Sequence, residues 1–332
     1  MLRLVFMGSD PIALPALNWL TGEGSRLVGI VGVFTQPDRA VGRGQKVRAN
    51  EIKSWAQAHS VPVFQPAKVG DAERRVLAEL KPDLTLVMAY GHILRQEIID
   101  APRLGTFNLH TSLLPLYRGA SPIQTAICSG DTETGVSFMR LVLKLDAGPV
   151  ADVERVPIAP LDTAADIEAK LGPACVPLLA RVLPALDGGS QRFTDQDESR
   201  ATFCRRLEKS DGSLDFTAPA SVLAARINGL TPWPGCVVTI NNQPVKPGRA
   251  DLGSLLDYKP AGPGTVIGVE AEGLLVETGQ GVLRLRMLQR PGGRMLPAAE
   301  FLRGFPVPAG TRLASQAMSP LVARTPFPRP KV

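Results

Sequence analysis

The feature that most constrains this fold is an alternation of β-like and helix-like segments over the first 130 residues. Short apolar runs alternate with helix-like stretches (in parentheses) in the order 2–7, (11–20), 27–35, (50–59), 61–64, (71–80), 83–90, 105–112, (122–128). Strands that alternate with helices favour parallel pairing, because each helix carries the chain back across the sheet. We therefore predict an α/β fold, an open and mostly parallel Rossmann-like sheet with ligands bound beyond the carboxyl ends of its strands.

A change of pattern after residue 189 divides the chain. Residues 190–204 are polar and turn-prone, which indicates a linker and makes 1–189 the first domain. Residues 205–318 hold short apolar runs between Gly- and Pro-rich turns, a pattern typical of a small OB-like β-barrel. The Pro-rich end, 319–332, contains no acidic residue and is predicted to be disordered.

Three prolines interrupt the last helix-like region of the first domain. Because proline removes a helical hydrogen bond, Pro173, Pro177 and Pro184 are expected to break the helix over 162–186. No run of about 18 apolar residues occurs in the sequence, so no membrane span is predicted.

The cysteine and histidine content excludes disulfide scaffolds and zinc ribbons. Among 332 residues there are four cysteines and three histidines, with no CxxC pair and no metal-ligand spacing. Free cysteines fit a reducing compartment. We therefore predict a soluble cytoplasmic protein without a metal.

The net charge of +6 is unevenly distributed along the chain. Residues 1–200 contain 21 Lys and Arg against 22 Asp and Glu, whereas residues 201–332 contain 16 against 9. A basic C-terminal part suggests a polyanionic partner, although a bias toward solubility explains it equally well. One Gly-rich segment of the first domain, 37–48, carries four cations and one anion and is predicted to be an exposed, mobile loop.

Two polar side chains end a predicted strand. Asn108 and His110 share one face, because side chains alternate along a strand. An amide that donates to an oxyanion and an imidazole that moves protons suit acyl transfer, and Asp146 after a later strand could orient the imidazole. A strand-end pair that only hydrogen-bonds a loop, and an aspartate that only starts a turn before Gly148, are the plainer alternatives.

Longer motifs around these residues resemble the folate-dependent formyltransferases, and among them the methionyl-tRNA formyltransferase family. The resemblance spans roughly residues 3–315 and rests on motifs at 34–44, 108–115, 117–124, 145–148, 230–235, 243–246 and 297–304. It implies formyl transfer from 10-formyltetrahydrofolate to the α-amino group of methionyl initiator tRNA, by direct acyl transfer through a tetrahedral intermediate.

The resemblance also assigns residues. It implies that Asn108, His110 and Asp146 are catalytic, that the co-substrate folate contacts Ser112–Pro115, and that the C-terminal barrel cradles tRNA. The folate-contacting residues are thus Ser112, Leu113, Leu114 and Pro115. The tRNA-contacting cations are Arg39, Arg43, Lys46 and Arg48. We expect a monomer without metal or membrane attachment.

Two other functions are alternatives to this one. A folate-dependent formyltransferase for a small amine would share the catalytic residues but would need neither the basic loop nor a basic barrel. A non-catalytic tRNA-binding protein would need no Asn108, His110 or Asp146, and their presence argues against it.

The sequence departs from the family pattern near the site. Lys144 stands where a glycine is usual, two residues before Asp146, and we expect its side chain to point to solvent. His92 and Arg95 also replace the usual residues, at the start of the helix after 83–90.

Overall fold

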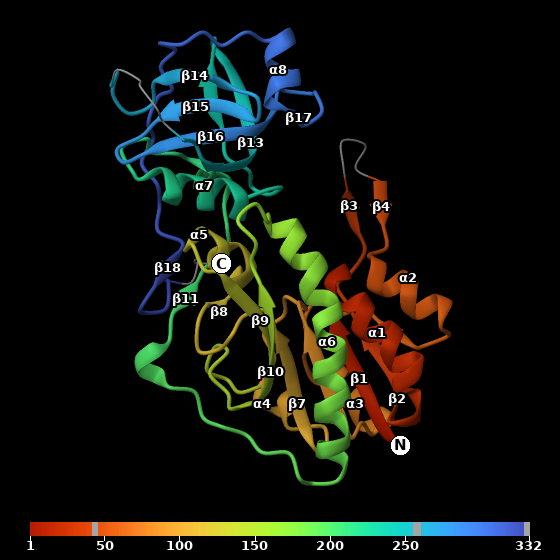
Figure 1. Ribbon diagram of the computed structural model, residues 1–332. Helices are drawn as coiled ribbons and strands as arrows, with labels where there is room; N and C mark the ends of the chain where they lie inside the picture. Colours follow the sequence, from red (N-terminus) through yellow and green to blue (C-terminus); the bar gives the residue numbers. More distant parts are fainter. Residues whose placement is uncertain (42–45, 255–259, 329–332) are drawn as a thin grey trace. The chain divides into compact units, whose positions relative to one another are not determined.

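The structure is a computed structural model that describes residues 1–41, 46–254 and 260–328, without the side chains of residues 41 and 46. Its contacts divide the chain into two compact units, whose elements are labelled in Figure 1. The first unit comprises Met1–Arg118, Gly135–Val156 and Glu168–Ala201. The second comprises Gly119–Thr134, Pro157–Ile167 and Thr202–Val332. Two segments from the first half of the sequence therefore group with the C-terminal part.

A seven-stranded sheet in the order β10-β9-β7-β6-β1-β2-β5 forms the first unit. Its strands are β1 (Leu2–Gly8), β2 (Val28–Phe34), β5 (Val63–Phe64), β6 (Leu84–Met88), β7 (Gly105–His110), β9 (Glu133–Arg140) and β10 (Val150–Pro157). Five neighbouring strands of this sheet run parallel, namely β5, β2, β1, β6 and β7, and β9 pairs antiparallel with β7. The predicted open, mostly parallel α/β sheet is thereby confirmed.

Burial of both sheet faces explains why the central strands are continuous apolar runs. Every residue of β6 is buried, as is nearly all of β1. Helices supply the covering layers (Figure 1): α1 (Leu14–Thr21), α2 (Glu51–Ala58), α3 (Asp71–Leu80), α4 (Gln96–Ile99) and α6 (Ala164–Asp187). The α2 helix begins where Asn50 accepts a hydrogen bond from the Lys53 backbone N–H at 2.9 Å.

The α6 helix runs unbroken through the three prolines, contrary to the prediction. Pro173, Pro177 and Pro184 all lie on its exposed face, where carbonyls that lose a helical donor can bond to water. Leu171 and Leu178 lie on the buried face. By length and composition alone α6 could cross a membrane, but its buried face is that of a core helix.

An antiparallel half-barrel forms the second unit, in the order β12-β13-β16-β15-β14 with β17 on β16. Its strands are β12 (Val238–Ile240), β13 (Gln243–Leu252), β14 (Val266–Glu270), β15 (Gly273–Glu277), β16 (Val282–Gln289) and β17 (Leu296–Pro297). Helices α5 (Pro122–Cys128), α7 (Ala220–Gly229) and α8 (Ala298–Gly304) complete it. This agrees with the predicted small OB-like barrel, and a single apolar core fills it.

The Pro-rich end is ordered as far as the structure describes it, which corrects the prediction of disorder for 319–328. Strand β18 (Val322–Ala323) pairs antiparallel with β11 (Phe203–Cys204), next to β8 (Arg118–Gly119) in a small sheet. Leu321 is buried, and Arg205 donates to the Pro320 carbonyl. Backbone pairing and one buried leucine thus order a segment whose composition indicated disorder. Residues 329–332 lie outside the described part.

Candidate active site

The predicted catalytic strand lies inside the sheet of the first unit. β7 is flanked by β6 and β9, and it carries Asn108 and His110 at its carboxyl end. Strand alternation places both side chains on one face, with buried Leu109 on the other. Within the described part of the chain the Asn108 amide has no hydrogen-bond partner, so its N–H groups are available to an oxyanion.

The imidazole of His110 is held by a main-chain carbonyl. His110 Nε2 lies 3.0 Å from the carbonyl oxygen of Tyr117, and the side chain is only 6% exposed. Because a carbonyl only accepts, Nε2 carries the hydrogen of the neutral ring. Nδ1 is therefore the atom that can take up or release a proton.

His110 Nδ1 faces Asp146, the third of the predicted catalytic residues. The distance from Nδ1 to Asp146 Oδ2 is 3.8 Å, which is too long for a hydrogen bond but close enough for an ion pair with a protonated imidazole. The Asp146 carboxylate can thus stabilise the charge that His110 acquires on accepting a proton. The structure therefore brings Asp146 and His110 together across two separate segments.

Asp146 sits in a tight turn between β9 and β10. Its φ of +45° lies in the left-handed region, which costs energy for a residue other than glycine. Gly148 is required in the same turn, because a Cβ there would lie 1.8 Å from the Arg140 carbonyl oxygen. The strained backbone of Asp146 needs support from its surroundings, and the sequence around it does not reveal where that support comes from.

The support comes from residues that the sequence analysis assigned to a linker. Gln196 Nε2 donates to the carbonyls of Asp146 at 2.8 Å and Gly148 at 2.7 Å. Lys144, as expected, points to solvent with 64% of its side chain exposed, and it pairs with Glu198 at 2.9 Å. No sequence motif marks Gln196 or Glu198, because polar residues of this kind are common in any loop.

The predicted folate-contacting loop is internally braced. Ser112 is fully buried, and its hydroxyl donates to the Leu116 carbonyl at 2.6 Å. Leu113, Leu114 and Pro115 are each partly exposed, so they present an apolar surface to a ligand. A ligand at this loop would contact these three residues rather than the Ser112 hydroxyl.

Of the residues that depart from the family pattern, His92 packs against the buried Tyr90, whereas Arg95 and Lys144 are exposed. The rings of Tyr90 and His92 meet edge to face with centroids 4.9 Å apart. Burial lowers the pKa of His92, so the ring is neutral at physiological pH. Among the described residues, the Tyr90 hydroxyl and His92 Nε2 are buried without a hydrogen-bond partner. Arg95 precedes α4 as its N-cap residue, so the helix starts beyond the substituted positions.

The predicted tRNA-contacting segment is partly a hairpin rather than a loop. β3 (Arg39–Val41) pairs antiparallel with β4 (Lys46–Arg48), and Arg39 lies directly opposite Arg48. Both arginines are exposed, and Arg39 donates to Gln36 Oε1 at 2.7 Å. Arg43 and the Lys46 side chain lie outside the described residues.

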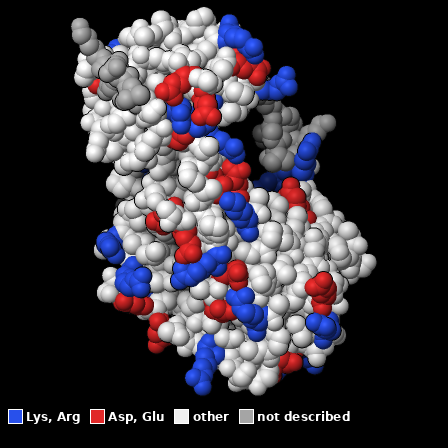
Figure 2. All heavy atoms as spheres, viewed as in Figure 1, with Lys and Arg blue, Asp and Glu red and all other residues white. Residues whose placement is uncertain are grey.

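Charges on the viewed face are mixed rather than gathered by sign. Figure 2 shows Lys and Arg interspersed with Asp and Glu. In the second unit, Arg284 and Arg286 both bind Asp251 at 2.8 Å. Part of the positive charge of the C-terminal region is therefore paired within the fold.

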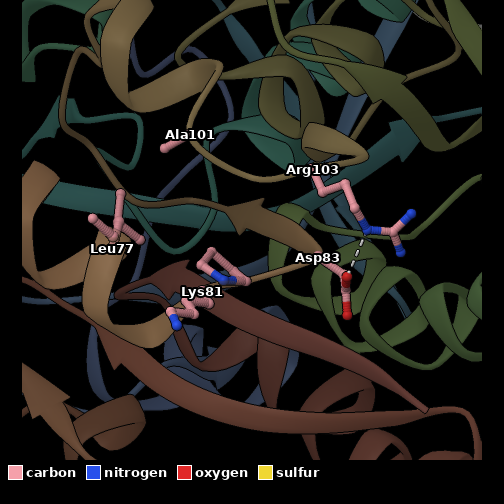
Figure 3. A pocket seen from close by; sticks show the side chains of 7 residues that line it. Leu77, Lys81, Asp83, Ala101 and Arg103 are labelled. Carbon is pink, nitrogen blue, oxygen red and sulfur yellow. Dashed lines mark hydrogen bonds and ion pairs between the residues drawn. The ribbon is translucent and has the colours of Figure 1, made fainter.

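A shallow hollow of about 390 Å³ lies at the opposite end of the sheet. Asp83 and Arg103, joined at 2.9 Å, line it just before β6 and β7 begin, together with Leu77, Lys81 and Ala101 (Figure 3). His110 ends β7, so this hollow is not part of the candidate site. Among the described residues no cluster of three His, Cys, Asp or Glu could hold a metal ion.

The sequence matches the formyl transferase family over residues 2–183 and the formyl transferase C-terminal domain over residues 206–306. The chain belongs to the formyl transferase family. The resemblance drawn from the sequence motifs is thereby confirmed, and the chain is a formyl-transferring enzyme of the folate-using type.

Relatives of similar length are found among methionyl-tRNA formyltransferases. That of Gluconobacter oxydans is 40% identical over 314 residues, which cover 94% of this chain and 100% of the relative. That of Pseudomonas syringae pv. syringae is 41% identical over 296 residues, which cover 89% and 92%.

Solved structures share the fold at low identity. The N-formyltransferase from Helicobacter canadensis has a TM-score of 0.65 at 18% identity, covering 87% of this chain and 100% of that one. HypX from Aquifex aeolicus, in complex with tetrahydrofolic acid, has a TM-score of 0.56 at 17% identity, covering 91% and 47%.

Proposed function

We propose that this enzyme transfers the formyl group of 10-formyltetrahydrofolate to the α-amino group of methionine on initiator tRNA. Two relatives of about 40% identity that cover most of this chain carry the name methionyl-tRNA formyltransferase, which supports this choice of acceptor. The observation that carries the chemistry is the approach of His110 Nδ1 to the Asp146 carboxylate at the carboxyl end of β7.

The reaction exchanges one carbon–nitrogen bond for another. The formyl carbon leaves N10 of the folate and bonds to the amine, which must lose a proton while the leaving nitrogen gains one. A free α-amino group titrates near ~7.7–8.0, so part of it is already neutral at physiological pH. No covalent enzyme intermediate is required.

Each of the three residues has a separate role in this exchange. His110 Nδ1 takes the proton from the attacking nitrogen, and the Asp146 carboxylate stabilises the resulting imidazolium. The Asn108 amide donates a hydrogen bond to the oxygen of the formyl group as it becomes negative. The proton then passes from His110 to the leaving nitrogen.

Binding of the two substrates uses different parts of the first unit. Leu113, Leu114 and Pro115 offer apolar contacts to the folate, while Ser112 keeps their loop in place. Arg39, Arg43, Lys46 and Arg48 supply positive charge for tRNA, and the exposed hairpin positions of Arg39 and Arg48 support this. We further infer that the enzyme acts as a cytoplasmic monomer without membrane attachment, and sedimentation analysis tests the monomer.

One assay separates the possible acceptors. Purified enzyme and 10-formyltetrahydrofolate are offered methionyl initiator tRNA, uncharged initiator tRNA, or an amino-sugar nucleotide, and formylated product is measured. We expect product from methionyl initiator tRNA alone. Formylation of the amino sugar without formylation of the tRNA would assign the enzyme to small amines.

A further inference from the structure

We propose that Gln196 is a positioning residue for formyl transfer, which holds the strained turn of Asp146 in its orientation toward His110. The inference rests on the proposed roles of Asp146 and His110. It gives the extended segment after α6 a function in the active site, beyond that of a linker between domains (Figure 1).

Both hydrogens of the Gln196 amide are used on the Asp146 turn. Nε2 lies 2.8 Å from the Asp146 carbonyl oxygen and 2.7 Å from that of Gly148. The two carbonyls bracket Ala147, so one amide clamps both sides of the turn. Asp146 has a φ of +45°, a conformation that persists in a non-glycine residue when its surroundings fix it.

The other end of the amide is fixed by a buried cation. Gln196 Oε1 accepts hydrogen bonds from Arg118 Nε at 3.0 Å and Nη2 at 2.8 Å. Arg118 only donates and the turn carbonyls only accept, so the amide has a single allowed orientation. The Arg118 side chain is completely buried, which leaves it little freedom to move.

The carboxylate of Glu198 neutralises Arg118. It lies 3.0 Å from Arg118 Nη2, and it also binds Lys144 Nζ at 2.9 Å. Lys144 stands two residues before Asp146, so Gln196 and Glu198 hold the turn from both sides. Just before them, Thr194 exchanges two backbone hydrogen bonds with Val150 at 2.9 Å, which anchors the segment to β10.

The same network reaches the imidazole. Arg118 follows Tyr117, whose carbonyl accepts the hydrogen bond from His110 Nε2. Fixing Arg118 therefore fixes the chain at the group that orients His110. One buried arginine and one glutamine thus connect the support of both His110 and Asp146, and a displacement of about 1 Å at such groups can cost about a hundredfold in rate.

The test replaces Gln196 by glutamate, which can still accept from Arg118 but cannot donate to the two carbonyls. We expect kcat for formylation of methionyl initiator tRNA to fall by about 10- to 100-fold, with KM for both substrates within about twofold of wild type. The matched control is Gln191→Glu in the same segment, because Gln191 donates to the Ala151 and Arg192 carbonyls instead. The control should keep wild-type kcat.

A double-mutant cycle with Asp146→Ala distinguishes positioning from a general loss of stability. If Gln196 acts mainly through Asp146, adding Gln196→Glu to Asp146→Ala should lower kcat by much less than Gln196→Glu does in wild type. Wild-type turnover in Gln196→Glu, or full additivity in the cycle, would overturn the proposal while leaving the proposed function intact. Wild-type turnover in Asp146→Ala would instead remove the catalytic assignment, and the positioning role with it.

Folding is controlled separately. If Gln196→Glu does not fold, Gln196→Met, of similar length and uncharged, is used with the same readouts. Failure of both variants to fold would show that Gln196 serves stability alone, which would overturn the positioning role.

Discussion

The orientation of one imidazole determines what the candidate site can do. The Tyr117 carbonyl accepts a hydrogen bond from His110 Nε2, so Nδ1, which faces Asp146, is the ring nitrogen available as the proposed base. Replacing His110 by glutamine keeps a donor for the carbonyl but removes the base. We expect the single-turnover rate of formylation to fall by about 10²–10⁴ with tRNA affinity nearly unchanged. A rate within a few-fold of wild type would show that His110 is not the base.

The contribution of Glu198 to the stability of the fold should depend on pH. Hydrogen bonds from Arg118, and then from Lys144, lower the pKa of Glu198 from 4.5 to about 2. Because the folded pKa is depressed, the carboxylate stabilises the fold above pH 4.5, and this contribution is lost as the pH falls toward 2. The melting temperature of wild type should therefore exceed that of Glu198→Gln at pH 7, and this difference should vanish on acidification. The difference should be small because Glu198 is half exposed. A difference in melting temperature that is constant with pH would contradict this account.

The sequence points to the candidate site residues whose side chains can do chemistry, but not to the residues that support them. Asn108, His110 and Asp146 are recognisable because few side chains can donate to an oxyanion or carry a proton. The Tyr117 carbonyl cannot be found this way, since every residue has one. Gln196 contacts Asp146 although the two residues are 50 positions apart in the sequence, and only the fold reveals such a pair.

Prolines lie inside two regular elements, α6 and β13. Proline in α6 is tolerated because it faces water, whereas the sequence pattern alone predicted a break. Strand β13, which is ten residues long, contains Pro244, Pro247 and Gly248, residue types that the sequence pattern assigns to turns. The register of β13 against β16 shifts between Pro247 and Arg249, and such a bulge accommodates proline in a sheet.

Helices α5 and α7 pack closely together at Gly229. A Cβ on Gly229 would lie 2.5 Å from Cys128 Sγ and 2.8 Å from the Gln124 carbonyl oxygen, so the two helices would have to separate. Gly229→Ala gains up to about 1 kcal/mol of helix propensity but should still destabilise the protein, because overpacking costs about 1–3 kcal/mol. Urea unfolding measures the change. Gly304→Ala, which meets no atom within 4 Å, is the control, and equal stability of the two variants would refute the tight contact.

In the molecule as a whole, the domain boundary predicted from the sequence differs from the division of the chain by its contacts. Composition changes at the linker, so the predicted first domain ends at residue 189. Contacts instead place 119–134 and 157–167 with the C-terminal unit, because α5 packs on α7 and Asn228 donates to the Pro160 carbonyl. A sequence read in order cannot show that two early segments fold with a late one.

Exposed charge on the β3–β4 hairpin should affect the use of tRNA. Arg48 lies exposed on β4, opposite Arg39, so its charge acts outward on whatever approaches the hairpin. If tRNA binds there, each phosphate that is neutralised releases counterions, and affinity falls with added salt. Arg48→Ala should therefore lower kcat/KM for methionyl initiator tRNA and reduce the slope of log kcat/KM against log salt by about 0.7–0.9. KM for the folate should not change.

Arg74→Ala on α3, another exposed arginine of the first unit, serves as the control for a general loss of positive charge. If Arg48→Ala and Arg74→Ala give the same slope as wild type, the hairpin does not contact the tRNA backbone and its cations serve solubility only.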